Sequence, residues 1–143
     1  MRQPNRPMVV VDPTHHDGES SVARAVAVSS PGAAVVLAMP VTGPAARALR
    51  DYAAAESLTI AEAAAMYARQ IRARLATSGL ELAVVTHLES DDLVQELLIE
   101  IGRTQADAVI LPGGGASPSP ADRGGLLRRS AVAVIDDPVA PAA

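Results

Sequence analysis

Five short runs of apolar residues alternate with helix-like segments along most of this chain. The runs cover residues 8–11, 34–37 with an extension to 39, 82–85, 108–111 (in a strand expected over 107–111) and 132–135. Continuous apolar runs of this kind are typical of strands that are buried on both faces of a parallel sheet. Because the connections are long enough for helical crossovers, the pattern predicts a three-layer, doubly wound α/β fold with a five-stranded, mainly parallel sheet.

The size of the chain limits it to one core. Its 143 residues predict a single domain over 1–143, with flexible ends at 1–7 and 136–143. There is no Phe or Trp and there are only two Tyr, while Ala and Val are abundant. We therefore expect a core in which small side chains bring backbones close together.

Composition also excludes several classes of function. Without cysteine, the chain can form neither disulfides nor thiolate metal sites. A net charge of −4 gives no reason to expect nucleic acid or an anionic membrane as a partner. Residues 1–8 lack the apolar core of a signal peptide, and no run reaches the roughly 18 apolar residues of a membrane helix. We expect a cytoplasmic protein.

Capping signals predict where the helices lie. Thr59 and Glu62 have the spacing of a capping box, and the helix that they begin should run to Gly79. Another helix should start near 17–20, and residues 45–56 should be helical. Ser90 is expected to cap a further helix, with Asp91 and Asp92 in its first turn. Only one helical turn, over 126–130, is expected near the C-terminus.

A glycine-rich loop follows the fourth run, in the sequence DAVILPGGG. Three glycines allow close approach of a ligand, and free N–H groups after a parallel strand can hold phosphate oxygens. A plain surface turn is the alternative. Asp12, Val41, His87 and Gly113 all follow predicted strands, so four turns should meet at one edge of the sheet, where ligands of such folds bind.

The chain resembles the universal stress protein family over residues 8–135. The resemblance rests on the opening VVVD, the VVLAMPV run, the segment LAVVTHLESDDLVQELL and the DAVILPGGG strand. It implies the doubly wound fold of the adenine nucleotide alpha hydrolase type. Some members of the family bind ATP, others do not, and most dimerise through the last strand.

The family's nucleotide motif, G-x2-G-x9-G-S/T, is only partly present. Pro112 stands at the first glycine, Gly115 matches the second and Gly125 the third, but Leu126 replaces the Ser or Thr. Each hydrogen-bond donor lost in this way would weaken the free energy of nucleotide binding by about 1–3 kcal/mol if nothing replaced it. Arg123, with Arg128 and Arg129, could supply positive charge instead.

The resemblance implies a set of ligand-binding positions. The adenine side comprises Asp12, Pro13, Thr14 and Val41, and the phosphate side comprises Gly113, Gly114, Gly115 and Gly125. The cofactor implied is ATP or another adenine nucleotide. The alternative is a degenerate member that binds no nucleotide and acts as a dimerisation or protein-interaction module.

Catalytic and metal chemistry are not expected. No general base is evident near the glycines, so any ATP hydrolysis should be slow and incidental. His15, His16 and Asp17 are adjacent in one loop, and adjacent residues seldom point at one metal.

The last apolar run predicts an assembly. Residues 132–135 should form an edge strand, and an exposed apolar edge is a template for pairing with another chain. The first charges, Asp136 and Asp137, lie beyond its end. We expect a two-fold symmetric homodimer in which this strand pairs antiparallel with its copy and buries Val132 and Val134.

Overall fold

The computed structural model describes residues 3–11, 20–43, 46–113 and 118–136. The elements, in chain order, are β1 (Pro7–Val10), α1 (Ser20–Val28), β2 (Ala34–Pro40), α2 (Arg47–Ala55), α3 (Ile60–Thr77), β3 (Glu81–Leu88), α4 (Leu93–Thr104), β4 (Ala108–Ile110), α5 (Pro120–Arg129) and β5 (Ala133–Ile135).

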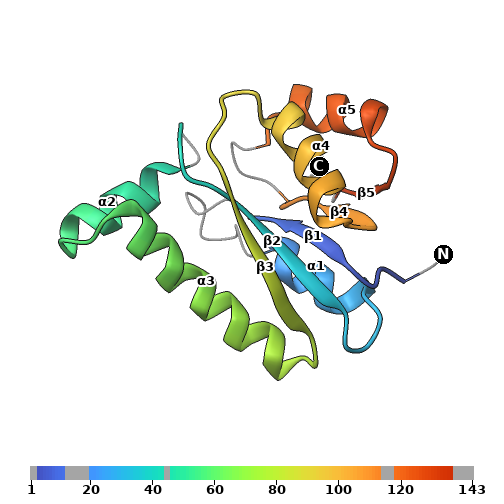
Figure 1. Cartoon of the computed structure of the whole chain (residues 1–143), viewed down its shortest axis with the longest axis horizontal. Coiled ribbons are helices and arrows are strands. Elements are labelled where there is room, and N and C mark those ends of the chain that lie inside the picture. Colours follow the sequence, from blue (N-terminus) through green and yellow to red (C-terminus); the bar gives the residue numbers. More distant parts are fainter. Residues whose placement is uncertain (1–2, 12–19, 44–45, 114–117, 137–143) are drawn as a thin grey trace, which may run out of the picture.

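The strands form one five-stranded sheet in the order β3-β2-β1-β4-β5, and every neighbouring pair is parallel (Figure 1). β1 lies at the centre, where Met8 is in register with Val36 of β2 and Val109 of β4. The predicted doubly wound α/β fold is therefore confirmed.

The central strand divides the core into two halves. Val9 of β1 belongs to the cluster that α1, α2 and α3 cover, whereas Met8 and Val10 belong to the cluster that α4 and α5 cover. Because successive side chains of a strand point to opposite faces, the fully apolar sequence of β1 supplies both clusters. These two helical layers and the sheet make up the three layers.

Small side chains build much of the first cluster. On α3 the buried residues are Ala63, Ala64, Ala68, Ile71 and Leu75. Three of these five are alanines, so small side chains fill this part of the core, as expected from the absence of Phe and Trp. The second cluster includes Leu97 and Ile101 of α4 and Leu126 of α5.

The ends of α3 follow the sequence signals. The Thr59 hydroxyl accepts a hydrogen bond from the Glu62 N–H at 3.0 Å, and the Glu62 carboxylate accepts one from the Thr59 N–H at 3.0 Å. The same contacts lower the pKa of Glu62 from its usual value. Gly79 follows the helix with φ of 78°, a left-handed conformation that favours glycine.

The start of α4 differs from the prediction. Asp92, not Ser90, is the N-cap, and its carboxylate accepts a hydrogen bond from the Gln95 N–H at 3.1 Å. Ser90 instead accepts from the Asp92 N–H within the turn, at 3.1 Å. Asp91 and Asp92 thus precede the first turn, because the preceding strand extends to Leu88 and leaves a short connection.

The C-terminal helix is longer than predicted. Ten residues form α5, from Pro120 to Arg129, where only the turn at 126–130 was expected. Ser119 caps the helix, and Pro120 occupies its first position. Helices tolerate proline there because an N–H at that position would have no acceptor within the helix. The glycines at 124 and 125 obscured this helix in the sequence.

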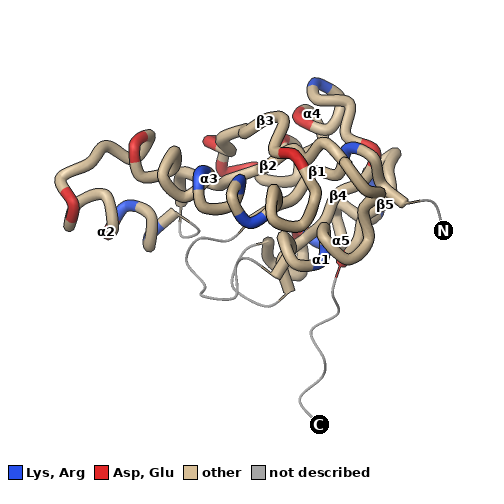
Figure 2. Tube along the Cα trace, turned by 90° about the horizontal axis from the view of Figure 1, so that it is seen from below, with Lys and Arg blue, Asp and Glu red and all other residues tan. Residues whose placement is uncertain are grey.

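The two residues before β1 are bound by one carboxylate of a distant segment. Asp107 accepts hydrogen bonds from the N–H groups of Asn5 and Arg6 at 2.7 and 3.0 Å. Along the described trace, charges of both signs are distributed over the helices (Figure 2). None of the described helices combines the length and the hydrophobicity needed to span a bilayer.

Candidate functional site

β1 and β4 lie side by side at the point where the chain order of the sheet reverses. Val9 is in register with Ile110, so the two strands end at the same edge. The connection after β1 leads through α1 to β2 on one side, while β4 and β5 continue on the other (Figure 1). Such a switch point is where open α/β sheets bind ligands.

The first turn of α1 meets the exit of β4 at this switch point. The Gly113 N–H donates a hydrogen bond to the Ser20 Oγ at 2.8 Å. α1 also packs against both β1 and β4. Gly113 therefore lies where the sequence placed it, at the carboxyl edge of the sheet, but its N–H is already bound within the protein.

Arg123 of α5 holds the two ends of the glycine-rich segment. Its Nη2 donates to the Pro112 carbonyl at 2.5 Å and its Nε to the Pro118 carbonyl at 3.0 Å. Nη1 forms a salt bridge with Asp136, and the arginine side chain is only 12% exposed. The guanidinium charge is thus used inside the protein.

The N-terminus of α5 is capped by its own residues. The Ser119 hydroxyl accepts from the Asp122 N–H at 3.2 Å, and Pro120 brings no N–H to the first turn. Asp122 places a negative charge where a phosphate would need positive potential. This helix end is consequently a poor phosphate site.

Gly125 and Leu126 lie inside α5. Gly125 is buried, and a Cβ built on it would be 3.5 Å from a methyl group of Val94. Leu126 is 1% exposed and belongs to the second core cluster. The backbone N–H of a residue in a helix interior is bonded within the helix. Gly125 therefore matches the spacing of the family motif but is not a loop glycine.

Val41 lies at the same edge, after β2. Its N–H donates to the Leu88 carbonyl at 3.0 Å, and its half-buried side chain packs against the first core cluster. The neighbouring Thr42 hydroxyl donates to the Glu89 carbonyl at 3.1 Å. These bonds tie together the turns that follow β2 and β3.

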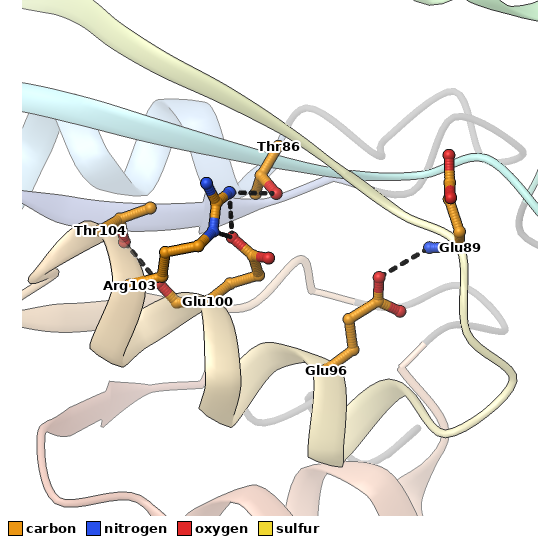
Figure 3. Close-up of polar contacts among 6 residues, drawn as sticks. All are labelled: Thr86, Glu89, Glu96, Glu100, Arg103 and Thr104. Carbon is orange, nitrogen blue, oxygen red and sulfur yellow. Dashed lines mark hydrogen bonds and ion pairs between the residues drawn. The ribbon is translucent and has the colours of Figure 1, made fainter.

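A row of polar contacts on α4 supports the turn after β3 (Figure 3). Glu96 accepts from the Glu89 N–H at 2.8 Å and from the Ser90 N–H at 2.6 Å. Further along the helix, Glu100 forms an ion pair with Arg103 and raises the pKa of that arginine. Of these contacts, those of Glu96 tie α4 to the turn after β3.

The other predicted positions, Asp12, Pro13, Thr14, Gly114 and Gly115, lie outside the described residues, as do His15, His16 and Asp17. One functional candidate was missed by sequence reasoning. Ser21, in the first turn of α1, is fully buried, and its hydroxyl has no hydrogen-bond partner. A serine pair at the start of a helix was the available signal, but its burial could not be read from the sequence.

Comparison with known proteins identifies the fold. No protein-family model and no curated protein matches the chain. A solved structure from the universal stress protein family of Burkholderia pseudomallei is similar, with a TM-score of 0.63 and 16% identity over 94% of this chain and 96% of that one. A universal stress protein in complex with cAMP gives a TM-score of 0.61 and 16% identity over 96% and 99% of the two chains.

A third solved structure, the universal stress protein UspA from Lactobacillus plantarum, has a TM-score of 0.60 and 14% identity, and covers 96% of this chain and 100% of that one. The likeness extends over nearly the whole length of each chain. The chain therefore has the universal stress protein fold, which confirms the resemblance drawn from its sequence.

Proposed function

We propose that this protein is a stress-response module of the universal stress protein type that binds an adenine nucleotide at the carboxyl ends of β1 and β4. The observation that carries the proposal is the hydrogen bond from Gly113 to Ser20. It brings the first turn of a helix against the exit of β4 at the switch point, where backbone N–H groups and hydroxyls can meet a ligand.

In this proposal Asp12, Pro13 and Thr14 contact the base or the ribose, beside Val41 at the end of β2. The backbone of Gly114 and Gly115, which lie outside the described residues, is proposed to contact the phosphate side. A universal stress protein of the same fold is known in complex with cAMP, and that ligand supports an adenine nucleotide here. The proposed role is binding, and any ATP hydrolysis would be slow and incidental.

The residues around α5 favour a nucleotide with one phosphate over ATP. Asp122 opposes a further phosphate at this helix end, and Pro120 offers it no N–H. Arg123 is held by two carbonyls and Asp136, so its charge is not available to a second or third phosphate. AMP or a cyclic nucleotide meets fewer of these obstacles than a triphosphate does.

The second candidate function is a dimerisation or protein-interaction module that binds no nucleotide. Leu126 favours it, because the position where the family has a hydroxyl is filled by a core side chain that is 1% exposed.

A homodimer through β5 is compatible with either function. This strand is at the edge of the sheet, and its outer side pairs with no other described strand. Ala133 is exposed there, while Val132 and Val134 are half-buried against the second core cluster. An antiparallel partner strand would cover this edge.

Thermal unfolding with AMP, cAMP and ATP-Mg tests the proposal. A ligand at 100 times its dissociation constant adds about 2.7 kcal/mol to the free energy of unfolding, which raises the midpoint by several degrees. We expect larger shifts with AMP or cAMP than with ATP, and none with GMP as the matched control. If no adenine nucleotide shifts the midpoint at millimolar concentration, the second candidate function stands instead.

A further inference from the structure

We propose that Met66 of α3 is an oxidation site at which hydrogen peroxide forms a methionine sulfoxide, and that the Tyr52 hydroxyl of α2 binds the sulfoxide oxygen. Both residues line a groove between α2 and α3. These helices lie on the β3 side of the sheet, away from β4 and β5 (Figure 1). The inference is therefore separate from the nucleotide site proposed at β1 and β4.

Met66 is the accessible methionine within the described part of the chain. It is 37% exposed, whereas Met8 and Met39 are each 0% exposed in the core. Peroxide reaches a thioether only where solvent reaches it, so oxidation follows exposure. We therefore expect Met66 to react while the two core methionines are protected.

Tyr52 is already bonded to the sulfur of Met66. Its hydroxyl donates to the Met66 Sδ with 3.9 Å between the two atoms, and a thioether sulfur is only a weak acceptor. Oxidation places a polar oxygen on that sulfur, and this oxygen accepts hydrogen bonds far better than the thioether does. The oxidised side chain thus offers Tyr52 a better partner than the unmodified one.

The groove has room for the added oxygen. Its volume is about 160 Å³, which exceeds the roughly 30 Å³ that one water molecule occupies in the liquid. Ala48, Leu49 and Ala63 give it a largely apolar lining. A polar oxygen against such a lining is unfavourable unless it is hydrogen-bonded, so the Tyr52 hydroxyl is what makes the sulfoxide tolerable there.

The contact between Tyr52 and Met66 joins α2 to its main packing partner. α2 packs chiefly against α3, and its buried residues are Leu49 and Ala53. Modification of Met66 therefore acts on the interface that holds α2. With its oxygen bound by Tyr52, the sulfoxide leaves α2 in place. Without that hydroxyl, the same oxygen would weaken the packing of the two helices.

The reaction is a two-electron oxygen transfer. A lone pair of the Met66 sulfur attacks one oxygen of hydrogen peroxide, so that an S–O bond forms and the O–O bond breaks. The departing hydroxide takes the proton from the transferred oxygen and becomes water. The sulfur is oxidised and the peroxide is reduced, which balances the step, and a methionine sulfoxide reductase can reverse it.

Mild peroxide treatment followed by cleavage after arginine tests the site. Cleavage places Met8, Met39 and Met66 in three different peptides, so mass spectrometry follows each methionine separately. We expect Met66 to gain one oxygen at least roughly tenfold faster than the other two, because a buried sulfur reacts only when the protein opens. Oxidation of Met66 that is no faster than that of Met8 and Met39 would overturn the proposal.

Thermal unfolding before and after peroxide treatment tests the role of Tyr52. Oxidation should lower the midpoint of Tyr52→Phe by about 3–5 °C more than that of wild type, since the sulfoxide oxygen then has no donor. Tyr67→Phe and Gln70→Leu remove the other two polar side-chain groups of the groove lining, and both should respond as wild type does. Met66→Leu should not respond to peroxide.

Each comparison is made between the treated and untreated forms of one variant, so the effect of the substitution itself cancels. Equal responses of wild type and Tyr52→Phe would overturn the role of Tyr52. A response of Tyr67→Phe or Gln70→Leu as large as that of Tyr52→Phe would do the same. A shift that persists in Met66→Leu would assign the effect to another residue and overturn the oxidation site.

Discussion

The guanidinium of Arg123, near the start of α5, forms a salt bridge with the carboxylate of Asp136, the residue that follows β5. The same guanidinium binds the carbonyls of Pro112 and Pro118. One side chain therefore links the last helix, the end of the last strand and both flanks of the glycine-rich segment.

Replacing Arg123 with Met should destabilise the protein by roughly 2–3 kcal/mol, because two carbonyls and a largely buried carboxylate lose their partner. Denaturant unfolding measures the change. Arg128→Met is the control, since Arg128 lies on the exposed side of the same helix. Equal stabilities of the two variants would contradict the structural role of Arg123.

Leu126→Ser restores the hydroxyl of the family motif. It should lower the free energy of unfolding by about 3–5 kcal/mol and should not create nucleotide binding. Leu126 is 1% exposed in the second core cluster, so the change leaves a cavity and buries a hydroxyl. Unfolding by denaturant gives the first quantity, and titration with ATP-Mg gives the second. A stable variant that binds ATP more tightly would refute this placement of Leu126.

Gly125→Ala should stabilise the protein by about 0.5–1 kcal/mol. The residue lies in a helix interior, and the added methyl would meet Val94 at an ordinary contact distance of 3.5 Å. A glycine required for close phosphate approach would instead show a loss of nucleotide binding with alanine. Measuring both stability and AMP affinity of this variant separates the two roles.

The capping box predicts that Glu62 makes a pH-dependent contribution to the free energy of unfolding. Its pKa in the folded state is lowered, chiefly by the Thr59 backbone N–H, so its charged form stabilises the protein above the unfolded-state pKa near 4.5. That contribution should be lost as the pH falls through the folded-state value. Wild type should therefore be more stable than Glu62→Gln at pH 7, and the difference in free energy of unfolding should disappear once the pH is below the folded-state pKa of Glu62. A difference that stays constant with pH would show that the charge of Glu62 does not contribute.

The proposed dimer is tested on its edge strand by light scattering at tens of micromolar protein. Ala133→Lys and Val134→Lys should both give monomers, because each adds a charge to the edge strand that the partner would pair with. Ala133 is exposed in the protomer, so its substitution should leave the circular dichroism spectrum unchanged. A monomeric wild type, or a dimer that persists in both variants, would exclude this interface.

The fold could be predicted because its signals are local. The apolar runs, the capping box at Thr59 and the left-handed Gly79 each reflect a backbone requirement that a few neighbouring residues satisfy. The parallel pairing of the strands followed from the alternation of strands and helices. The start of α4 was misplaced because Ser90, Asp91 and Asp92 are all acceptable caps, and the sequence alone does not distinguish Asp92 from the other two.

The site was less predictable because its contacts join distant segments. Arg123 was interpreted as a charge for phosphate, yet the structure gives that charge to Asp136. Gly125 matched the spacing of the family's nucleotide motif, and this match would matter only if Gly125 were in a loop. In the structure Gly125 lies inside α5. Ser21 carried no motif, since what distinguishes it is burial against strands that are far away in sequence.

The place of β1 at the centre of the sheet has a consequence for how the protein is made. The Asn5 amide bonds to a carboxylate 102 positions further along the chain, and β1 pairs with β4 just beyond it. During synthesis the first strand therefore leaves the ribosome with one of its two sheet edges unoccupied until most of the chain has followed. Because contacts of such long sequence separation slow folding and expose strand edges, β1 is the segment that a chaperone would be expected to shield.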